Sequence, residues 1–210
     1  MAFSWALLFE EDFKSLTLID AGIPGITLTN DIQPSDFKRK WNFTFQMLPD
    51  LAAELTNRKK DVYVRWWCKN QVHNQSAISS DDVASYVQSY AREGRMNAAM
   101  DYCRRIMEDI DFNTSQLKRK SLVPLPAVDG EYSIPNMAES LRPYFQKPIV
   151  ISNSGHFVPE EQPDALAKAL LSFLKATRTG MSPIATRVLA MLAKRGYSSR
   201  CTGVAGNRTM

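Results

Sequence analysis

The fold is decided by the stretch Pro148-Ile149-Val150-Ile151-Ser152, then Asn153, then Ser154-Gly155-His156-Phe157-Val158-Pro159-Glu160-Glu161-Gln162-Pro163. Its apolar start predicts a short strand, Gly155 permits a sharp turn, and the prolines and glutamates predict a helix start. His156 would therefore lie at the carboxyl end of a strand, where open α/β sheets gather their chemistry. A neutral imidazole accepts a proton near pH 7, which makes His156 the candidate catalytic base. The alternative for an isolated Ser-Gly-His is a structural turn histidine.

Strands and helices alternate around this stretch, with one long helical insertion. Apolar runs predict strands at 15–21, 122–128 and 148–152, and helices at 1–13, 137–145 and 164–177. Between the first two strands, apolar residues at intervals of three and four predict helices over 35–48, 50–58, 61–72, 79–92 and 96–110. The fold class is therefore α/β with an inserted all-helical segment.

Composition limits the function classes. With 210 residues and 44% hydrophobic content, the chain can bury one sizeable core beside an insertion. No apolar run reaches the roughly 20 residues that span a bilayer, and the N-terminal residues lack a secretory signal, so we expect a cytoplasmic protein. The three cysteines show neither a CxxC spacing nor a nearby histidine pair, so we expect no metal site and no disulfide framework.

Positive charge is concentrated at the C-terminal end. The net charge is +4, but seven of the 26 lysines and arginines lie from Lys175 onward and all 22 acidic residues precede it, which leaves residues 1–174 at −3. Basic and aromatic residues are not interleaved in the body of the chain, so we expect no nucleic-acid partner. Residues 179–210 are expected to form a basic extension, either one helix or disordered.

The pattern Ser-Gly-His-Phe-x-Pro-Glu-Glu-x-Pro with the amphipathic residues 165–174 resembles the catalytic-histidine segment of α/β-hydrolases, in particular the epoxide hydrolase and fluoroacetate dehalogenase branch. The resemblance implies that residues 1–30 and 121–178 form the C-terminal part of the hydrolase sheet and that residues 31–120 form a helical lid. It implies no cofactor. Lid aromatics such as Trp41, Phe43 and Phe45 favour a small apolar organic substrate.

The resemblance also implies an acid that orients the histidine. Residues 18–26, Leu-Ile-Asp-Ala-Gly-Ile-Pro-Gly-Ile, resemble the segment that supplies this acid in the dehalogenase branch, so Asp20 is the first candidate. The alternative for Asp20 is a loop-start residue that caps local N–H groups. The other usual place for the acid follows the second strand and falls on Ser133; Glu131 and Asp129 near it are the reserve candidates.

Two lid residues are expected to bind substrate. Trp41 resembles a lid tryptophan whose indole N–H donates to an anion, with a core aromatic as the alternative. The family pattern places a tyrosine directly before Arg104, where this chain has Cys103, so Tyr102 is the nearest candidate. His73 is expected to be solvated at a helix end, and Trp66, Trp67 and Tyr63 to pack the lid helices.

The sequence has no Gly-x-Asp-x-Gly or Gly-x-Ser-x-Gly elbow to carry a nucleophile. By resemblance, the strand with the nucleophile would precede Met1. Two hypotheses follow. The chain is a truncated hydrolase that is inactive alone, or it is a non-catalytic module that binds another chain or self-associates through an exposed sheet edge.

Overall fold

A small parallel sheet organises the fold. The structure, a computed structural model, describes residues 2–27, 37–116, 125–133 and 148–179. Three strands lie in the order β1 (Leu18–Ile19), β2 (Ala127–Gly130) and β3 (Ile149–Ile151), all parallel. Register pairs Leu18 with Ala127 and Val128 with Ile149. The expected α/β class, with a helical insertion between the first two strands, is confirmed.

The strands are shorter than predicted, and β2 is displaced along the chain. The second strand was expected over 122–128 but runs from Ala127 to Gly130. Pro126 just before it has no N–H to donate, although its carbonyl accepts from the Leu18 N–H at 3.1 Å. Residues 122–124 and the helix predicted at 137–145 lie outside the described residues.

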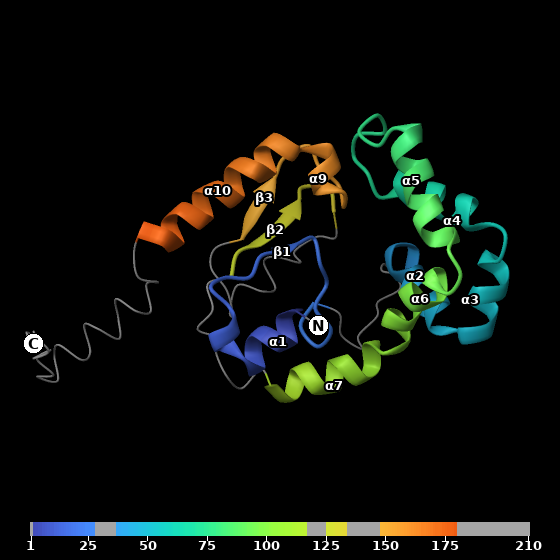
Figure 1. The fold of residues 1–210 in the computed structure, drawn as a ribbon, viewed down its shortest axis with the longest axis horizontal. Coiled ribbons are helices and arrows are strands. Elements are labelled where there is room, and N and C mark those ends of the chain that lie inside the picture. Colours follow the sequence, from blue (N-terminus) through green and yellow to red (C-terminus); the bar gives the residue numbers. More distant parts are fainter. Residues whose placement is uncertain (1, 28–36, 117–124, 134–147, 180–210) are drawn as a thin grey trace, which may run out of the picture.

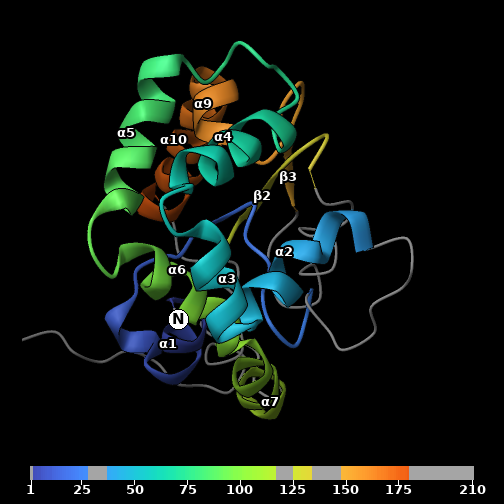
Figure 2. The same ribbon diagram turned by 90° about the vertical axis from the view of Figure 1, so that its right-hand side faces the viewer.

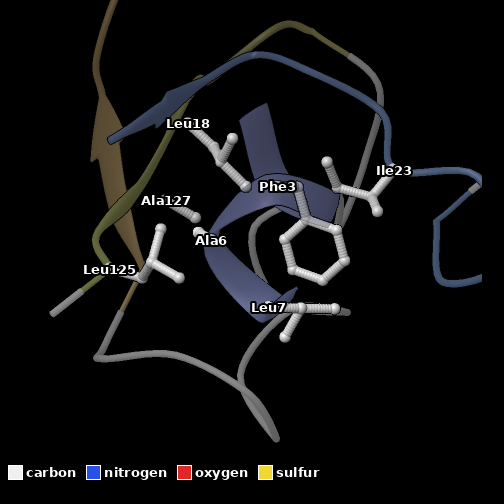
Figure 3. Close-up of a cluster of buried hydrophobic side chains, with 7 residues drawn as sticks. All are labelled: Phe3, Ala6, Leu7, Leu18, Ile23, Leu125 and Ala127. Carbon is white, nitrogen blue, oxygen red and sulfur yellow. The ribbon is translucent and has the colours of Figure 1, made fainter. Parts of the chain in front are cut away.

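Helix α1 (Ala2–Leu8) and the 3₁₀ turn η1 (Glu10–Asp12) cover one face of the sheet. The helix expected within residues 1–13 is therefore present. Figure 3 shows apolar side chains from α1 meeting side chains from β1, β2 and the adjoining loops: Phe3, Ala6, Leu7, Leu18, Ile23, Leu125 and Ala127. Burial of this cluster fixes β1, which Asp20 follows directly.

The opposite face is covered by α9 (Val158–Glu161) and α10 (Pro163–Thr179). Successive strand residues point to opposite faces, so Ile19 and Val128 pack on this side while Leu18 and Ala127 pack on the other. Val158 of α9 and Leu166 of α10 complete the second cluster. Figure 1 shows α10 running alongside β3, which confirms the helix predicted at 164–177.

The insertion contains six helices within residues 37–116, which we call the helical block. They are α2 (Phe37–Met47), α3 (Pro49–Thr56), α4 (Lys60–Asn70), α5 (Ser80–Ala91), α6 (Arg95–Arg104) and α7 (Ile106–Gln116). The prediction of a single helix over 96–110 was wrong, because the chain turns at Arg105. Ile106 and Ile110 continue the apolar spacing of Met96, Met100 and Cys103, so periodicity does not reveal that turn.

The helical block has its own apolar core. Its central cluster joins α3 to α6 through Ala52, Val64, Cys68, Val83, Met96 and Met100. Figure 1 shows α4 and α5 beside α9, and Figure 2 shows them in front of α9 and α10. The block therefore faces the His156 loop.

Within the described ranges, no helix is both long and apolar enough to cross a membrane.

Candidate active site

Asp20 and His156 meet at the carboxyl ends of parallel strands. Asp20 follows β1 directly, and His156 lies in the loop after β3. The Asp20 Oδ2 lies 2.7 Å from the His156 Nδ1. The Asp20 side chain is 2% exposed, whereas the His156 side chain is 41% exposed. Asp20 is thus buried, whereas the His156 side chain stays partly exposed.

Ser133 is the third member of this arrangement. Its hydroxyl lies 2.6 Å from Oδ1 and 2.5 Å from Oδ2 of Asp20 and donates to that carboxylate. The reserve acids are placed differently. Glu131 accepts the Asn153 N–H at 3.0 Å through Oε2, and Asp129 is buried within β2. Of these three acids, Asp20 is therefore the one that contacts the His156 ring.

Two glycines allow the His156 loop to pass close to its neighbours. A Cβ on Gly130 would lie 2.0 Å from the Gly155 carbonyl oxygen, and a Cβ on Gly155 would lie 2.6 Å from the Gln71 carbonyl oxygen. That same Gln71 oxygen accepts the His156 N–H at 2.8 Å. The backbone of the loop is thereby held directly against the end of α4.

Glu161 strengthens the same junction. Its carboxylate is buried, with 7% of the residue exposed. Oε1 accepts the Gly155 N–H at 2.8 Å, and Oε2 accepts the N–H groups of His73 and Asn74 at 2.7 and 2.9 Å. One side chain of α9 therefore binds the histidine loop and the loop after α4 together.

His73 adds a ring contact at this junction. Its imidazole stacks on the Tyr132 ring, with centroids 3.9 Å apart and planes 6° from parallel. His73 is exposed, as the sequence suggests, but it lies in the loop after α4 and contacts Tyr132, which follows β2. The contact supplements the hydrogen bonds of Glu161.

A cavity of about 370 Å³ opens between His156 and the helical block. Its aromatic lining comes from three places: α4, α5 and the histidine loop contribute Tyr63, Trp67, Tyr86, Tyr90 and Phe157. His156 and Glu160 lie on the same wall as Phe157, while Met96 and Met100 of α6 lie in the lining as well. The candidate base is therefore in contact with a mainly apolar space.

Tyr86 and Glu160 bridge two walls of the cavity. The Tyr86 hydroxyl of α5 donates to Oε1 of Glu160 in α9 at 2.7 Å. This hydrogen bond to a carboxylate, helped by burial, raises the pKa of Tyr86 to about 12, because ionised tyrosine could no longer donate. The tyrosine is therefore a neutral donor at physiological pH.

Known proteins are similar to this chain in sequence and in fold. No protein-family model matches the chain. A curated relative, the soluble epoxide hydrolase of Corynebacterium sp. (strain C12), is 26% identical over 189 residues, which cover 85% of this chain and 64% of the relative. In sequence and fold, the chain resembles part of an epoxide hydrolase-like α/β-hydrolase. It spans less than two thirds of that relative's length.

Solved structures agree with this family. Wild-type Cfl2 from Burkholderia cenocepacia is 34% identical, with a TM-score of 0.75 over 82% of this chain and 60% of Cfl2. The epoxide hydrolase CorEH without ligand is 22% identical, with a TM-score of 0.70 over 82% of this chain and 64% of CorEH. The likeness to CorEH concerns the fold, and in both cases the present chain corresponds to part of a longer chain.

Trp41, one expected substrate-binding residue, lies in an aromatic cluster and is not among the residues that line the cavity. Its ring centroid is 5.1 Å from that of Trp66 and 6.5 Å from that of Trp67. Trp67, in contrast, does line the cavity, although the sequence suggested that it would only pack the helices. Trp41 therefore stands behind a lining residue.

Tyr102, the other expected substrate-binding residue, does not line the cavity and is 44% exposed. Cys103 points to the inside of the block, and its Sγ lies 2.7 Å from Oε1 of Gln46, a cavity residue. Adjacent positions on a helix face about 100° apart, so only one of the two can face inward. Burial raises the pKa of the Cys103 thiol to about 11.

Sequence reasoning missed most of the lining. Tyr63 and Trp67, like Tyr86 and Tyr90, are four residues apart and so share one face of their helix. That spacing was a usable signal, but it is equally typical of a helix face packed against a core. Across the described residues, no group of three or more histidine, cysteine or acidic side chains is arranged to hold a metal ion.

Proposed function

We propose that this chain supplies the base, the orienting acid and the substrate pocket of an epoxide hydrolase-like enzyme. The observation that carries the proposal is the 2.7 Å contact between Asp20 and a histidine that lines the cavity. An acid buried behind an accessible imidazole fixes the imidazole tautomer and stabilises the imidazolium that forms when a proton is taken up.

The proposed reaction proceeds through an ester. An aspartate nucleophile attacks a carbon of the epoxide, the C–O bond of the ring breaks, and the ring oxygen takes a proton from solvent. His156 then accepts a proton from water through Nε2 while Asp20 holds Nδ1–H. The hydroxide attacks the ester carbonyl carbon, and cleavage of the acyl C–O bond gives a carboxylic acid and an alkoxide. The acid passes its proton to the alkoxide, which releases the diol and restores the carboxylate, and the imidazolium returns its proton to solvent. The nucleophile would come from outside these 210 residues, which contain no elbow motif.

The pocket supports a small apolar organic substrate. A space of about 370 Å³ with aromatic walls suits a molecule of modest size. We propose that residues 31–120 act as the lid over residues 1–30 and 121–178, since the helical block has its own core and forms the wall opposite His156. Tyr63 and Gln46 are polar groups of the helical block in this lining, and the Gln46 Nε2 donates to the Tyr63 hydroxyl at 2.6 Å.

A hydrolysis assay on epoxides and haloacids tests the proposal. The purified chain is expected to show no turnover alone and to gain turnover when co-expressed with an N-terminal hydrolase segment that bears an aspartate elbow. His156→Ala should abolish the restored activity. Asp20→Asn should lower it by about 10⁴-fold, because the tautomer would be wrong. Restored turnover that survives His156→Ala would overturn the proposed role of this histidine.

A second candidate function is that of a non-catalytic module that pairs through the edge of its sheet. Among the described strands β1 pairs only with β2, and the N–H groups of Leu18 and Asp20 both point to it. The intervening Ile19 N–H therefore faces the open edge. Turnover by the chain alone, abolished by His156→Ala, would exclude this function and require a replacement nucleophile.

A further inference from the structure

The cavity beside His156 combines aromatic walls with a single carboxylate. Five aromatic side chains line it, from α4, α5 and the histidine loop: Tyr63, Trp67, Tyr86, Tyr90 and Phe157. Glu160 is the acidic residue in the lining, and none of the described residues around the cavity is a lysine or an arginine. The fixed charge at this wall is therefore negative.

Tyr86 occupies only one of the two carboxylate oxygens of Glu160. Tyr86 donates to Oε1, and Oε2 has no hydrogen-bond partner in the described part of the chain. Burial raises the pKa of the Cys68 thiol, another lining group, and the charge of Glu160 adds to this rise. A ligand in the cavity would therefore sense an anion that Tyr86 satisfies only in part.

Aromatic faces carry negative quadrupole charge and attract cations within about 6 Å of the ring centroid. A carboxylate beside such rings adds direct attraction, whereas it repels an anion. We infer that this cavity binds a small organic cation, a substituted ammonium group, in preference to a neutral or anionic ligand of the same shape. The inference rests on the proposed function for the role of the cavity as substrate pocket, and it specifies a substrate that carries an ammonium group.

Three ligands of matched shape test the preference: choline, its uncharged isostere dimethylbutanol, and the corresponding carboxylate dimethylbutanoate. Binding to the full 210-residue chain is followed through the methyl resonances of Met96 and Met100, two buried methionines of the lining. Assignment uses Met96→Leu and Met100→Leu. Choline is expected to bind about tenfold more tightly than dimethylbutanol, and dimethylbutanoate more weakly than either.

Three variants locate the cause. Glu160→Gln keeps an oxygen for the Tyr86 hydroxyl but removes the charge, so it should remove most of the choline preference and leave dimethylbutanol binding unchanged. Tyr90→Leu removes one ring and should weaken choline about threefold. Glu93→Gln removes an exposed carboxylate that does not line this cavity and should change nothing. Native-like methyl resonances of Met96 and Met100 in the free variants show that each variant is folded.

Each outcome decides. Equal binding of choline and dimethylbutanol, tighter binding of dimethylbutanoate, or a preference that survives Glu160→Gln would overturn the inference. These results do not depend on turnover. The chain co-expressed with the N-terminal segment could hydrolyse a neutral epoxide while the cavity shows no preference for choline. That result would support the proposed function and contradict the inference. A choline preference with no hydrolysis under any condition would retain the cation site and remove the proposed reaction.

Discussion

Asp20 stands on left-handed backbone, with φ of 44°. Aspartate and asparagine tolerate this conformation better than other side chains that carry a Cβ, because their short polar groups bond locally. The backbone therefore restricts which acid can occupy the position. Glutamate would reach further but would begin from a less favourable conformation, which makes Asp20→Glu a poor substitute on structural grounds alone.

Gly130 gives the sharpest prediction for a single residue. Gly130→Ala should lower the free energy of unfolding by about 3 kcal/mol or more, because the new Cβ would lie 2.0 Å from the Gly155 oxygen. Chemical denaturation measures the change. Gly94→Ala is the matched control, since its Cβ meets nothing within 4 Å and only its φ of 72° opposes it. The control should cost about 1 kcal/mol. Equal costs would contradict the close approach.

At the scale of the element, α9 is short but holds two unlike glutamates. Glu160 faces the cavity and bonds one tyrosine, whereas Glu161 is buried and accepts three backbone N–H groups. Glu161 thus joins two loops, while Glu160 lines the cavity. Substitution of the two residues should have separate consequences.

Glu161→Gln should lower the free energy of unfolding by about 3 kcal/mol, since an amide nitrogen cannot accept the N–H groups that the carboxylate satisfies. Amide hydrogen exchange at Gly155, His73 and Asn74 should accelerate together. Glu160→Gln, one residue away, should leave exchange at those three amides unchanged. Protection that persists in Glu161→Gln would show that the carboxylate does not hold the loops.

The Tyr86 to Glu160 bond predicts a dependence of stability on alkaline pH. The folded-state pKa of about 12 lies above the ordinary value of 10.0, so the folded state binds the tyrosine proton more tightly than the unfolded state does. This stability is present below pH 10 and is lost as the pH rises toward 12. Tyr86→Phe should show a shallower loss between these values in urea titrations. An identical slope in both proteins would contradict the bond.

Local sequence predicted elements and the paired residues better than it predicted the pocket. His156 and Asp20 follow short apolar runs in recognisable segments, so their places at strand ends were found without a structure. Trp41 and Trp67 are both tryptophans on amphipathic helices, and which one lines a cavity depends on how α2 and α4 pack. Packing of one helix on another is set by the whole core and is not encoded in the periodicity of either helix.

At the scale of the molecule, the described sheet is narrow and β1 forms one edge of it. We expect the chain to self-associate through this edge, with a weight-average mass that rises with concentration in sedimentation equilibrium. Thr17→Pro should reduce the association, because proline at a strand start removes an N–H without breaking the bonds from Leu18 and Asp20 to β2. Concentration-independent monomer in the unsubstituted chain, or unchanged association in Thr17→Pro, would contradict this expectation.

The hydrogen bond from the His156 N–H to the Gln71 oxygen also affects the rates at which parts of the molecule move. An enzyme that admits its substrate by moving a covering segment opens on a scale of microseconds to milliseconds. In this molecule Gln71, at the end of α4 in the helical block, holds the backbone of the histidine itself. Movement of the helical block away from the cavity and movement of His156 should therefore occur at the same rate. Relaxation dispersion at His156 and at Gln71 should report the same exchange rate.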